Sequence, residues 1–361
     1  MLYSTVIRLE YEYVNARIKG MRRNLLNPSV FETLILKPDV DSIITELTNT
    51  AYKDEIEKAS VQYTGIRCIE VALRRDFSAA FRKILRFMKG DQKEDESEKY
   101  IKILLGRWDV QNIKTILRGK NIHIPSAEIL ECLVPAGELD ETTMVELIKQ
   151  SDVKAVIDLL ATWGISYAKP LTRNFKEYSE KRDLAILEYA IDRFYFKNAL
   201  LAVNGESYDD ILVRDMVMTE IDVTNIKIVL KMIRDKIDVE EARDYLIEGG
   251  KSLDIEKLLS MVRAGSLEGA IKLLETTPYG FLTKVPNEIL KAGKISVLEK
   301  ELEKYLIKLG ISRFLGDPLS IAIPVAYIWA KYNEITNIRI IARCKTADVP
   351  EKELRGELVY V

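Results

Sequence analysis

The stretch Asp109-Val-Gln-Asn-Ile-Lys-Thr-Ile-Leu-Arg118 occurs three times in this chain with small changes. It returns as Asp222-Val-Thr-Asn-Ile-Lys-Ile-Val-Leu-Lys231 and as Glu334-Ile-Thr-Asn-Ile-Arg-Ile-Ile-Ala-Arg343. A shorter match, Glu12-Tyr-Val-Asn-Ala-Arg17, precedes them. Chance would supply about 0.3 cases of an asparagine with an acid three residues before it and a base two residues after it. Four such cases indicate an internal repeat.

The asparagines of this motif set the length of the repeat. Asn112, Asn225 and Asn337 are 113 and 112 residues apart, and Asn15 lies 97 residues before Asn112. The segments that follow the copies of Asn112 and Asn225 also correspond, and residues 31–34 and 40–47 hold the equivalent place in the first unit. We therefore expect three helical units, and a partial fourth copy that completes the C-terminal domain. Their bounds are residues 1–107, 108–220, 221–332 and 333–361.

The hydrophobic pattern is that of α-helices almost throughout. Apolar residues recur at i, i+3, i+4 and i+7, whereas alternating patterns are nearly absent. The clearest helices are expected at residues 101–117, 144–160, 184–203, 255–274 and 297–309. The charged run 90–99 is expected to be a solvated loop or a frayed helix start. The sequence thus predicts an all-α protein.

On a helical wheel the repeated motif is buried on two sides and open along one. One apolar side carries Val110, Ile113 and Leu117, and a second, nearly opposite, carries Trp108, Asn112 and Ile116. The second copy has the same two sides. The motif helix is therefore expected to pack between two neighbours.

The asparagines are interpreted as structural anchors. Asparagine is an indifferent helix former, so its return at one register suggests an amide that is hydrogen-bonded across a helix–helix contact. The acid three residues earlier is its neighbour on the helix surface and is expected to hold the amide. This interpretation covers Asn15, Asn112, Asn225 and Asn337.

The open strip of the motif helix carries a repeated pair of bases. These residues, the basic strip, are Lys114, Arg118, Lys227, Lys231, Arg339 and Arg343. If the three units stand around a pseudo-threefold axis, the charges point in one common direction. The functional hypothesis is that they line a socket or rim for a protein partner. The alternative is three solvated helix faces.

Composition excludes several classes of function. The 54 lysines and arginines nearly balance 56 acids, giving a net charge of −2, which argues against a global electrostatic attraction to nucleic acid or anionic lipid but leaves room for a local basic patch. The single histidine, His123, is interpreted as structural, so catalytic residues, metal sites and cofactors are not expected. Cys68, Cys132 and Cys344 are interpreted as small buried thiols of a reducing cytoplasm.

No membrane span or signal peptide is expected. The N-terminus lacks a basic stretch followed by an apolar segment and a cleavage site. The most apolar window, residues 319–330, is interrupted by Pro324 and is shorter than the about 20 residues that a span requires. The protein is expected to be soluble or peripheral to a membrane.

The chain resembles the C subunit of the archaeal A-type ATP synthase, the relative of the d subunit of vacuolar ATPases. The resemblance covers effectively the whole chain. It rests on Tyr13-Val-Asn-Ala-Arg-Ile-Lys-Gly-Met-Arg-Arg-Asn-Leu-Leu26, on the triplicated helical pattern, and on the ending that runs from Glu334 through Val349-Pro-Glu-Lys-Glu-Leu-Arg-Gly-Glu-Leu-Val-Tyr-Val361.

That resemblance implies a funnel-shaped, all-α protein of three similar domains around a pseudo-threefold axis. It implies a non-catalytic rotor subunit that joins the membrane proteolipid ring to the central stalk, so that ion translocation drives ATP synthesis. Its place would be peripheral, at the cytoplasmic face of the cell membrane. Whether the ion is H⁺ or Na⁺, and whether ATP is made or hydrolysed, stays open.

Two other classes of protein fit the pattern less well. A prenyl or terpene synthase needs carboxylates one helical turn apart to hold magnesium and diphosphate, and the nearest candidate, Asp209 to Asp215, lacks an aspartate at position 213. A helical-repeat adaptor unrelated to ATPases is the second alternative. Such solenoids have many repeats of 34 to 47 residues, whereas this chain has three of about 112.

Overall fold

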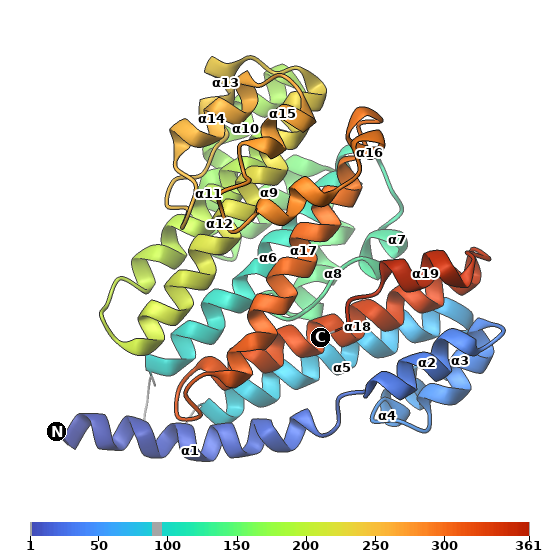
Figure 1. The fold of residues 1–361 in the computed structure, drawn as a ribbon. Helices are drawn as coiled ribbons and strands as arrows, with labels where there is room; N and C mark the ends of the chain where they lie inside the picture. Colours follow the sequence, from blue (N-terminus) through green and yellow to red (C-terminus); the bar gives the residue numbers. More distant parts are fainter. Residues whose placement is uncertain (1, 89–95, 361) are drawn as a thin grey trace. The chain divides into compact units, whose positions relative to one another are not determined.

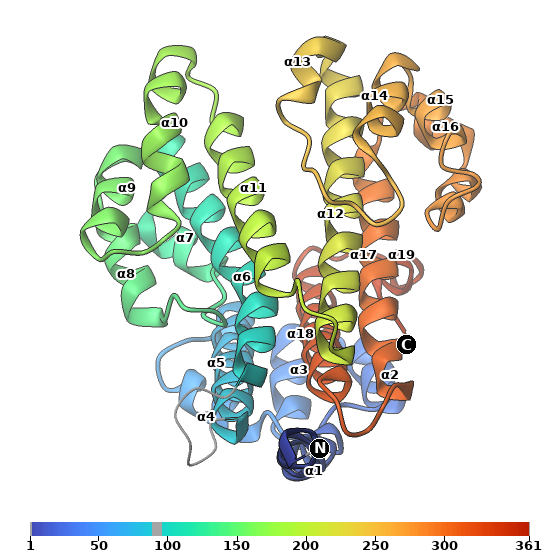
Figure 2. The same ribbon diagram turned by 90° about the vertical axis from the view of Figure 1, so that its left-hand side faces the viewer.

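The chain is helical throughout the part that the structure describes. The computed structural model describes residues 2–88 and 96–360, and within them it contains α-helices and short 3-10 helices but no strand. Figures 1 and 2 show the helices from two sides. The predicted all-α class is therefore confirmed.

The helices form two compact units. The first consists of Met1–Leu187 and Gly310–Val361, so it combines both ends of the chain. Its helices are α1 (Leu2–Arg22), α2 (Pro28–Leu36), α3 (Val40–Leu47), α4 (Lys53–Ser60), α5 (Gly65–Met88), α6 (Glu96–Asn121), α7 (Ser126–Glu131), α8 (Glu141–Lys149), α9 (Val153–Thr162), α10 (Ala168–Lys181), η2 (Arg313–Leu315), α18 (Ala322–Thr346) and α19 (Glu351–Glu357).

The second unit is the continuous segment Glu188–Leu309. It contains α12 (Tyr208–Asp235), α13 (Val239–Arg243), α14 (Ile255–Arg263), α15 (Leu267–Lys272), η1 (Gly280–Lys284) and α16 (Asn287–Lys291). Two helices cross the borders between the units, α11 (Ala185–Ala202) and α17 (Ile295–Ser312).

An aromatic cluster marks the core of the first unit between α5, α6 and α18. Phe77 meets Phe81 and Trp108 edge to face, with ring centroids 4.2 and 5.5 Å apart. Tyr332 joins Trp108 to Trp329 at 5.8 and 6.0 Å. Rings of this size bury much apolar surface and also prefer edge-to-face contacts, so they tie the three long helices together.

Two of the predicted helices are each interrupted. The structure confirms helices over 101–117, 184–203 and 297–309 to within five residues at each end, but 144–160 is divided into α8 and α9, and 255–274 into α14 and α15. At each break a side chain caps the next helix: Asp152 accepts from the Ala155 N–H at 2.9 Å, and Ser266 from the Gly269 N–H at 3.1 Å. A strong N-cap residue starts a new helix even where the apolar periodicity continues.

The cysteine interpretation is wrong for part of the set. Cys68 is buried as expected, but Cys132 is exposed and Cys344 is half-buried. Cys132 is the C-cap of the short helix α7, and the next residue, Leu133, is the one that is buried. His123 is also exposed, at a left-handed φ of 59° in the turn after α6.

Of the charged run, residues 90–95 lie outside the described residues. Its last part, from Glu96, opens helix α6.

Candidate functional site

Each of the three full copies of the repeated motif lies within one long helix. The copies are in α6, α12 and α18. Both apolar sides expected from the wheel are buried in α6 and in α12, and the asparagines Asn112, Asn225 and Asn337 are at most 2% exposed. The strip with the bases is the more exposed side of each helix. The motif helix is thus buried on two sides and open on one.

All three asparagines bind the backbone of the residue that follows them by 22 positions. Asn112 donates to the Val134 carbonyl at 2.7 Å and accepts from its N–H at 2.8 Å. Asn225 does the same with Ile247 at 2.7 and 2.9 Å, and Asn337 with Val359 at 2.9 and 3.1 Å. The amide therefore satisfies an extended backbone segment that has no helix or strand partner of its own.

The acid of the motif binds the same returning segment four to six residues further on. Asp109 accepts the N–H groups of Glu138 and Leu139 at 2.7 and 3.0 Å. Asp222 accepts those of Ser252 and Leu253 at 2.7 and 3.3 Å. The expectation that the acid holds the asparagine amide is therefore wrong. In these two copies acid and amide act side by side on one loop, and we call the backbone contacts made by the amide and acid of a motif copy its loop clamp.

A glycine closes over the carboxylate in both of these loop clamps. A Cβ atom at Gly137 would lie 2.2 Å from Oδ2 of Asp109, and one at Gly250 would lie 2.1 Å from Oδ1 of Asp222. Only glycine lets the loop backbone approach the carboxylate so closely. Gly137 and Gly250 are 113 residues apart, so the sequence carried this signal although periodicity did not show it.

The third loop clamp is completed by the other end of the chain. Glu334 accepts the Leu26 N–H through Oε2 and the Tyr52 hydroxyl through Oε1, the latter at 2.6 Å. Leu26 immediately precedes the helix cap Asn27, as Leu139 precedes Asp140 and Leu253 precedes Asp254. Leu26 and Tyr52, on either side of α2 and α3, thus contact the motif copy in α18. The sequence pattern instead assigns residues 31–34 and 40–47 to the unit of Asn15.

Asn15 has a different role from the other three. Its amide donates to the carbonyls of Pro318 and Ser320 at 2.8 and 2.9 Å, which lie just before α18. The residue 22 positions later does not take part. Asn15 therefore holds α1 against the start of α18 instead of closing a loop clamp of its own.

A buried tyrosine faces the acid of each loop clamp. Tyr279 donates to Asp222 at 2.9 Å, and Tyr52 donates to Glu334. Burial and the charge of nearby Asp109 raise the pKa of Tyr167. Burial raises the pKa of Asp109 to about 7, against the opposing effect of the two loop N–H groups. Burial likewise raises the pKa of Asp222, and the hydrogen bonds from Ser252 and Tyr279 oppose it.

The third loop clamp also contains a buried base. The Lys331 amino group lies 2.6 Å from Oδ2 of Asp76, 2.9 Å from Oε1 of Glu334 and 2.9 Å from the Tyr52 hydroxyl. Burial disfavours the charged amine, but Glu334 and Asp76 outweigh burial and raise its pKa. Lys331 is 5% exposed, and this ionic cluster joins α5, α18 and the α3–α4 turn. Sequence periodicity does not reveal it.

The bases of the basic strip in α12 and α18 contact or face acids of their own unit. Lys227 lies 3.4 Å from Glu303 and Lys231 lies 3.1 Å from Glu299. Arg343 binds Glu70 through Nε and Nη2 at 2.8 and 2.6 Å. Burial lowers the pKa of Arg339, against the attraction of Glu70.

The six bases of the basic strip fall into both units. Lys114, Arg118, Arg339 and Arg343 belong to the first, and Lys227 and Lys231 to the second. Lys114 is half-buried and Arg118 is exposed. Side-chain exposure is 44% for Lys231 and 54% for Arg343, so these charges reach solvent even though they are paired.

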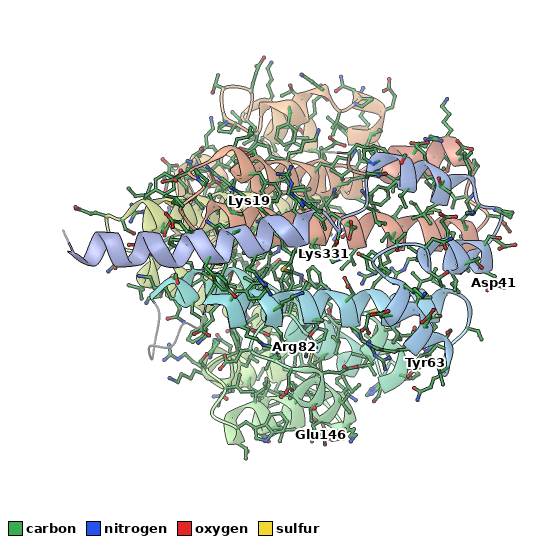
Figure 3. All side chains as sticks on the ribbon, turned by 90° about the horizontal axis from the view of Figure 1, so that it is seen from below. Lys19, Asp41, Tyr63, Arg82, Glu146 and Lys331 are labelled. Atoms are coloured by element: carbon green, nitrogen blue, oxygen red, sulfur yellow. The ribbon has the colours of Figure 1, made fainter. Side chains whose placement is uncertain are left out.

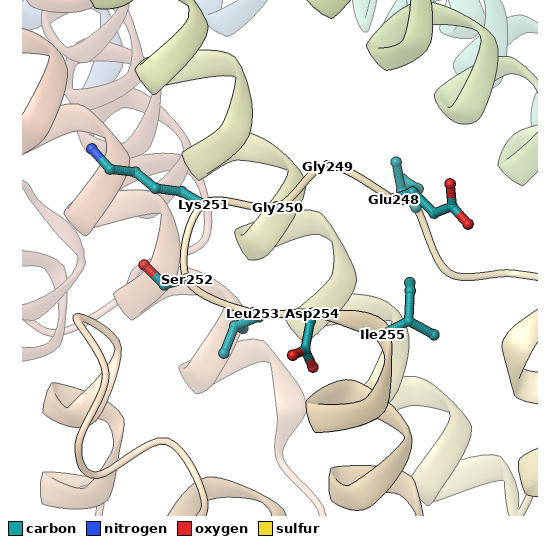
Figure 4. Close-up of a pocket in the computed structure, with 9 residues that line it drawn as sticks. Glu248, Gly249, Gly250, Lys251, Ser252, Leu253, Asp254 and Ile255 are labelled. Atoms are coloured by element: carbon teal, nitrogen blue, oxygen red, sulfur yellow. The ribbon is translucent and has the colours of Figure 1, made fainter.

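A cavity of about 400 Å³ borders the loop of the second loop clamp, from Ile247 to Ile255 (Figure 4). The run Gly249-Gly250-Lys251-Ser252 suggests a phosphate-binding loop, because backbone N–H groups in such a turn attract anions. Here the N–H of Ser252 is already taken by Asp222, and the Lys251 amine lies 2.6 Å from Asp215. The loop is thus satisfied by the protein's own carboxylates.

Neither a metal cluster nor a membrane helix is found among the residues described. Within 2–88 and 96–360, no group of three or more histidines, cysteines or acids is arranged to hold a metal ion. No helix in those ranges combines the length and the apolar character that crossing a membrane requires.

Comparison with known proteins gives one consistent result. Residues 14–357 match the family model described as ATP synthase (C/AC39) subunit. The chain is 31% identical over 355 residues to a protein of Methanococcoides burtonii named as the C subunit of A-type ATP synthase, covering 97% of this chain and 94% of that one. Proteins of the same name from Archaeoglobus fulgidus and Halobacterium salinarum are 29% and 28% identical, and the matches cover at least 97% of each chain.

Proposed function

Because the chain belongs to the ATP synthase (C/AC39) subunit family, we propose that it is the non-catalytic rotor subunit of an A-type ATP synthase, which couples the membrane proteolipid ring to the central stalk. The observation that carries this proposal is the match over residues 14–357, nearly the whole chain. The proposed place is peripheral, on the cytoplasmic face of the cell membrane. Three similar domains around a pseudo-threefold axis remain part of this proposal.

The loop clamps support a mechanical role. A part that transmits torque must resist bending and local unfolding under load. In the loop clamps of Asn112 and Asn225, the buried asparagine and acid side chains hold the returning loop against the long helix through four hydrogen bonds each. In a buried, low-dielectric site such bonds are strong, and leaving them unmade is costly.

The basic strip is proposed to take part in holding the protein partner. Lys231 and Arg343 are its best candidates, because their side chains reach solvent although each pairs with an acid. Replacing Lys231 by Gln removes the charge without creating repulsion against Glu299. We expect it to weaken partner binding, whereas the same change at Lys154, which pairs with Asp158 on the exposed side of α9, should have no effect.

The test of the rotor proposal is a pull-down from detergent-solubilised membranes of a cell that makes the complex, with the intact chain as bait. Recovery of proteolipid and central-stalk subunits is the expected result. Recovery of the complex without either of these neighbours would contradict the coupling role, and recovery of no ATP synthase component would favour the unrelated adaptor.

A further inference from the structure

A basic face runs along α1 and α5 in the first unit. The two helices are in contact, and Arg17 on α1 places its guanidinium 4.9 Å from the ring of Phe87 on α5. Figure 3 shows them side by side, with Lys19 and Arg82 labelled. The exposed bases that define this basic face are Arg17, Lys19, Arg23, Arg82, Lys83 and Arg86.

The positive charge of this face has a structural cause. The two acids of α5 are turned inward: Glu70 binds Arg343 and Asp76 binds Lys331. In residues 11–24 the one exposed acid is Glu12. Among the described residues none of the six bases has an ion-pair partner, although Asp140 is an electrostatic neighbour of Arg82. The acids of α5 thus pair with bases of α18, and the bases on the outside of α1 and α5 are left without a neutralising acid from α5.

Tyr13 adds an amphipathic ring to the basic face. Its side chain is 59% exposed and is held edge-on by Phe87, with ring centroids 6.5 Å apart. Among the large apolar side chains described on α1 and α5 it is the exposed one. Tyrosine favours the boundary between membrane and water, where its ring is half in each phase.

We propose that the basic face of α1 and α5 binds anionic phospholipid headgroups at the membrane surface. A protein interface is built around buried aromatic or apolar anchors, whereas this face offers spread charges and a single ring. Fluid headgroups can rearrange to meet such charges, and each base near an anionic membrane contributes about 1 kcal/mol. The inference rests on the proposed function in so far as that function brings the chain to a membrane.

The experiment is co-sedimentation of the purified full-length chain with vesicles. Phosphatidylcholine vesicles with about 30% phosphatidylserine are compared with phosphatidylcholine alone, at about 0.1 M and about 0.5 M salt. We expect binding to the anionic vesicles alone, and at least about tenfold weaker binding at the higher salt. Equal binding to neutral vesicles would overturn the proposal.

Two double variants probe the face, and a third is the matched control. Lys83→Glu with Arg86→Glu on α5, and Lys19→Glu with Arg23→Glu on α1, should each reduce affinity by at least about tenfold. The control, Lys169→Glu with Arg173→Glu, changes two exposed bases of α10, which lies far from α1 in both views of the unit (Figures 1 and 2). An equal loss in the control would overturn the proposal. Far-ultraviolet circular dichroism verifies that each variant is folded.

Two further outcomes separate this inference from its rivals. Tighter binding to a DNA duplex than to anionic vesicles at equal phosphate concentration would assign the face to nucleic acid instead of lipid. Absence of vesicle binding by a chain that still recovers the proteolipid and central-stalk subunits would refute the lipid proposal and leave the rotor proposal standing.

Discussion

At the scale of the single residue, Asn225 provides the pair of backbone hydrogen bonds that a neighbouring strand provides in a β-sheet. It offers one donor and one acceptor to the Ile247 backbone, 22 residues away, and it is 0% exposed. A side-chain amide has the same hydrogen-bonding groups as a peptide unit. It can therefore close a loop where neither a helix nor a sheet is available.

Replacing Asn225 by Ala should lower the free energy of unfolding by about 2–4 kcal/mol, because it leaves the buried N–H and C=O of Ile247 without partners. Urea denaturation followed by circular dichroism measures the change. Asn24, an exposed asparagine after α1, serves as the control, and its replacement by Ala should change stability by less than about 0.5 kcal/mol. Equal effects at the two positions would contradict the loop clamp.

Asp109 should make stability depend on pH. Burial raises its pKa to about 7, so the folded chain holds this proton more tightly than the unfolded chain, whose carboxyl has a pKa near 4. The resulting stabilisation is complete below about pH 4 and is lost as the pH rises through 7. Relative to Asp109→Asn, wild type should therefore lose about 2–3 kcal/mol between pH 5 and pH 8.

Denaturation of both proteins at the two pH values gives that difference directly. Asn112→Ala, in the same loop clamp, removes hydrogen bonds but no titrating group, so its difference from wild type should not change with pH. A constant difference for Asp109→Asn as well would show that the carboxyl does not titrate in this range.

At the scale of the element, the ionic cluster makes α18 depend on the N-terminal helices. Lys331→Met would leave Asp76 and Glu334 without their base, so we expect a loss of about 3–5 kcal/mol. Amide hydrogen exchange should accelerate in α3 and α4 as well as in α18. Lys154→Met, which breaks an exposed pair with Asp158, should cost less than about 1 kcal/mol. Unchanged exchange in α3 and α4 would refute the coupling.

The elements also show how far sequence reasoning reaches. Periodicity found the helices because each is read from neighbours three and four residues apart. It could not find the partners of the motif acids, which lie 29 and 30 residues away for Asp109 and 308 residues away for Glu334. Those partners are backbone groups of aperiodic loops, and their trace in the sequence is a pair of glycines and a set of helix caps at matching positions.

At the scale of the whole molecule, the two units differ in how the chain builds them. Glu188–Leu309 is continuous, whereas the other unit needs both chain ends, because Leu26 and Tyr52 complete the loop clamp of Glu334. A segment with its own core and uninterrupted connections can fold alone. The second unit meets that condition, with α12 and its loop clamp inside one segment.

A fragment of residues 183–312, which keeps α11 and α17 whole, should therefore be helical and unfold cooperatively by itself. Asn225→Ala should lower its melting temperature, because the clamp with Ile247 lies wholly within it. In the full chain the matched change Asn112→Ala should destabilise the other unit and leave the protection of α12 amides unchanged. A fragment that is unfolded, or whose melting is insensitive to Asn225→Ala, would mean that the second unit takes its stability from the rest of the chain.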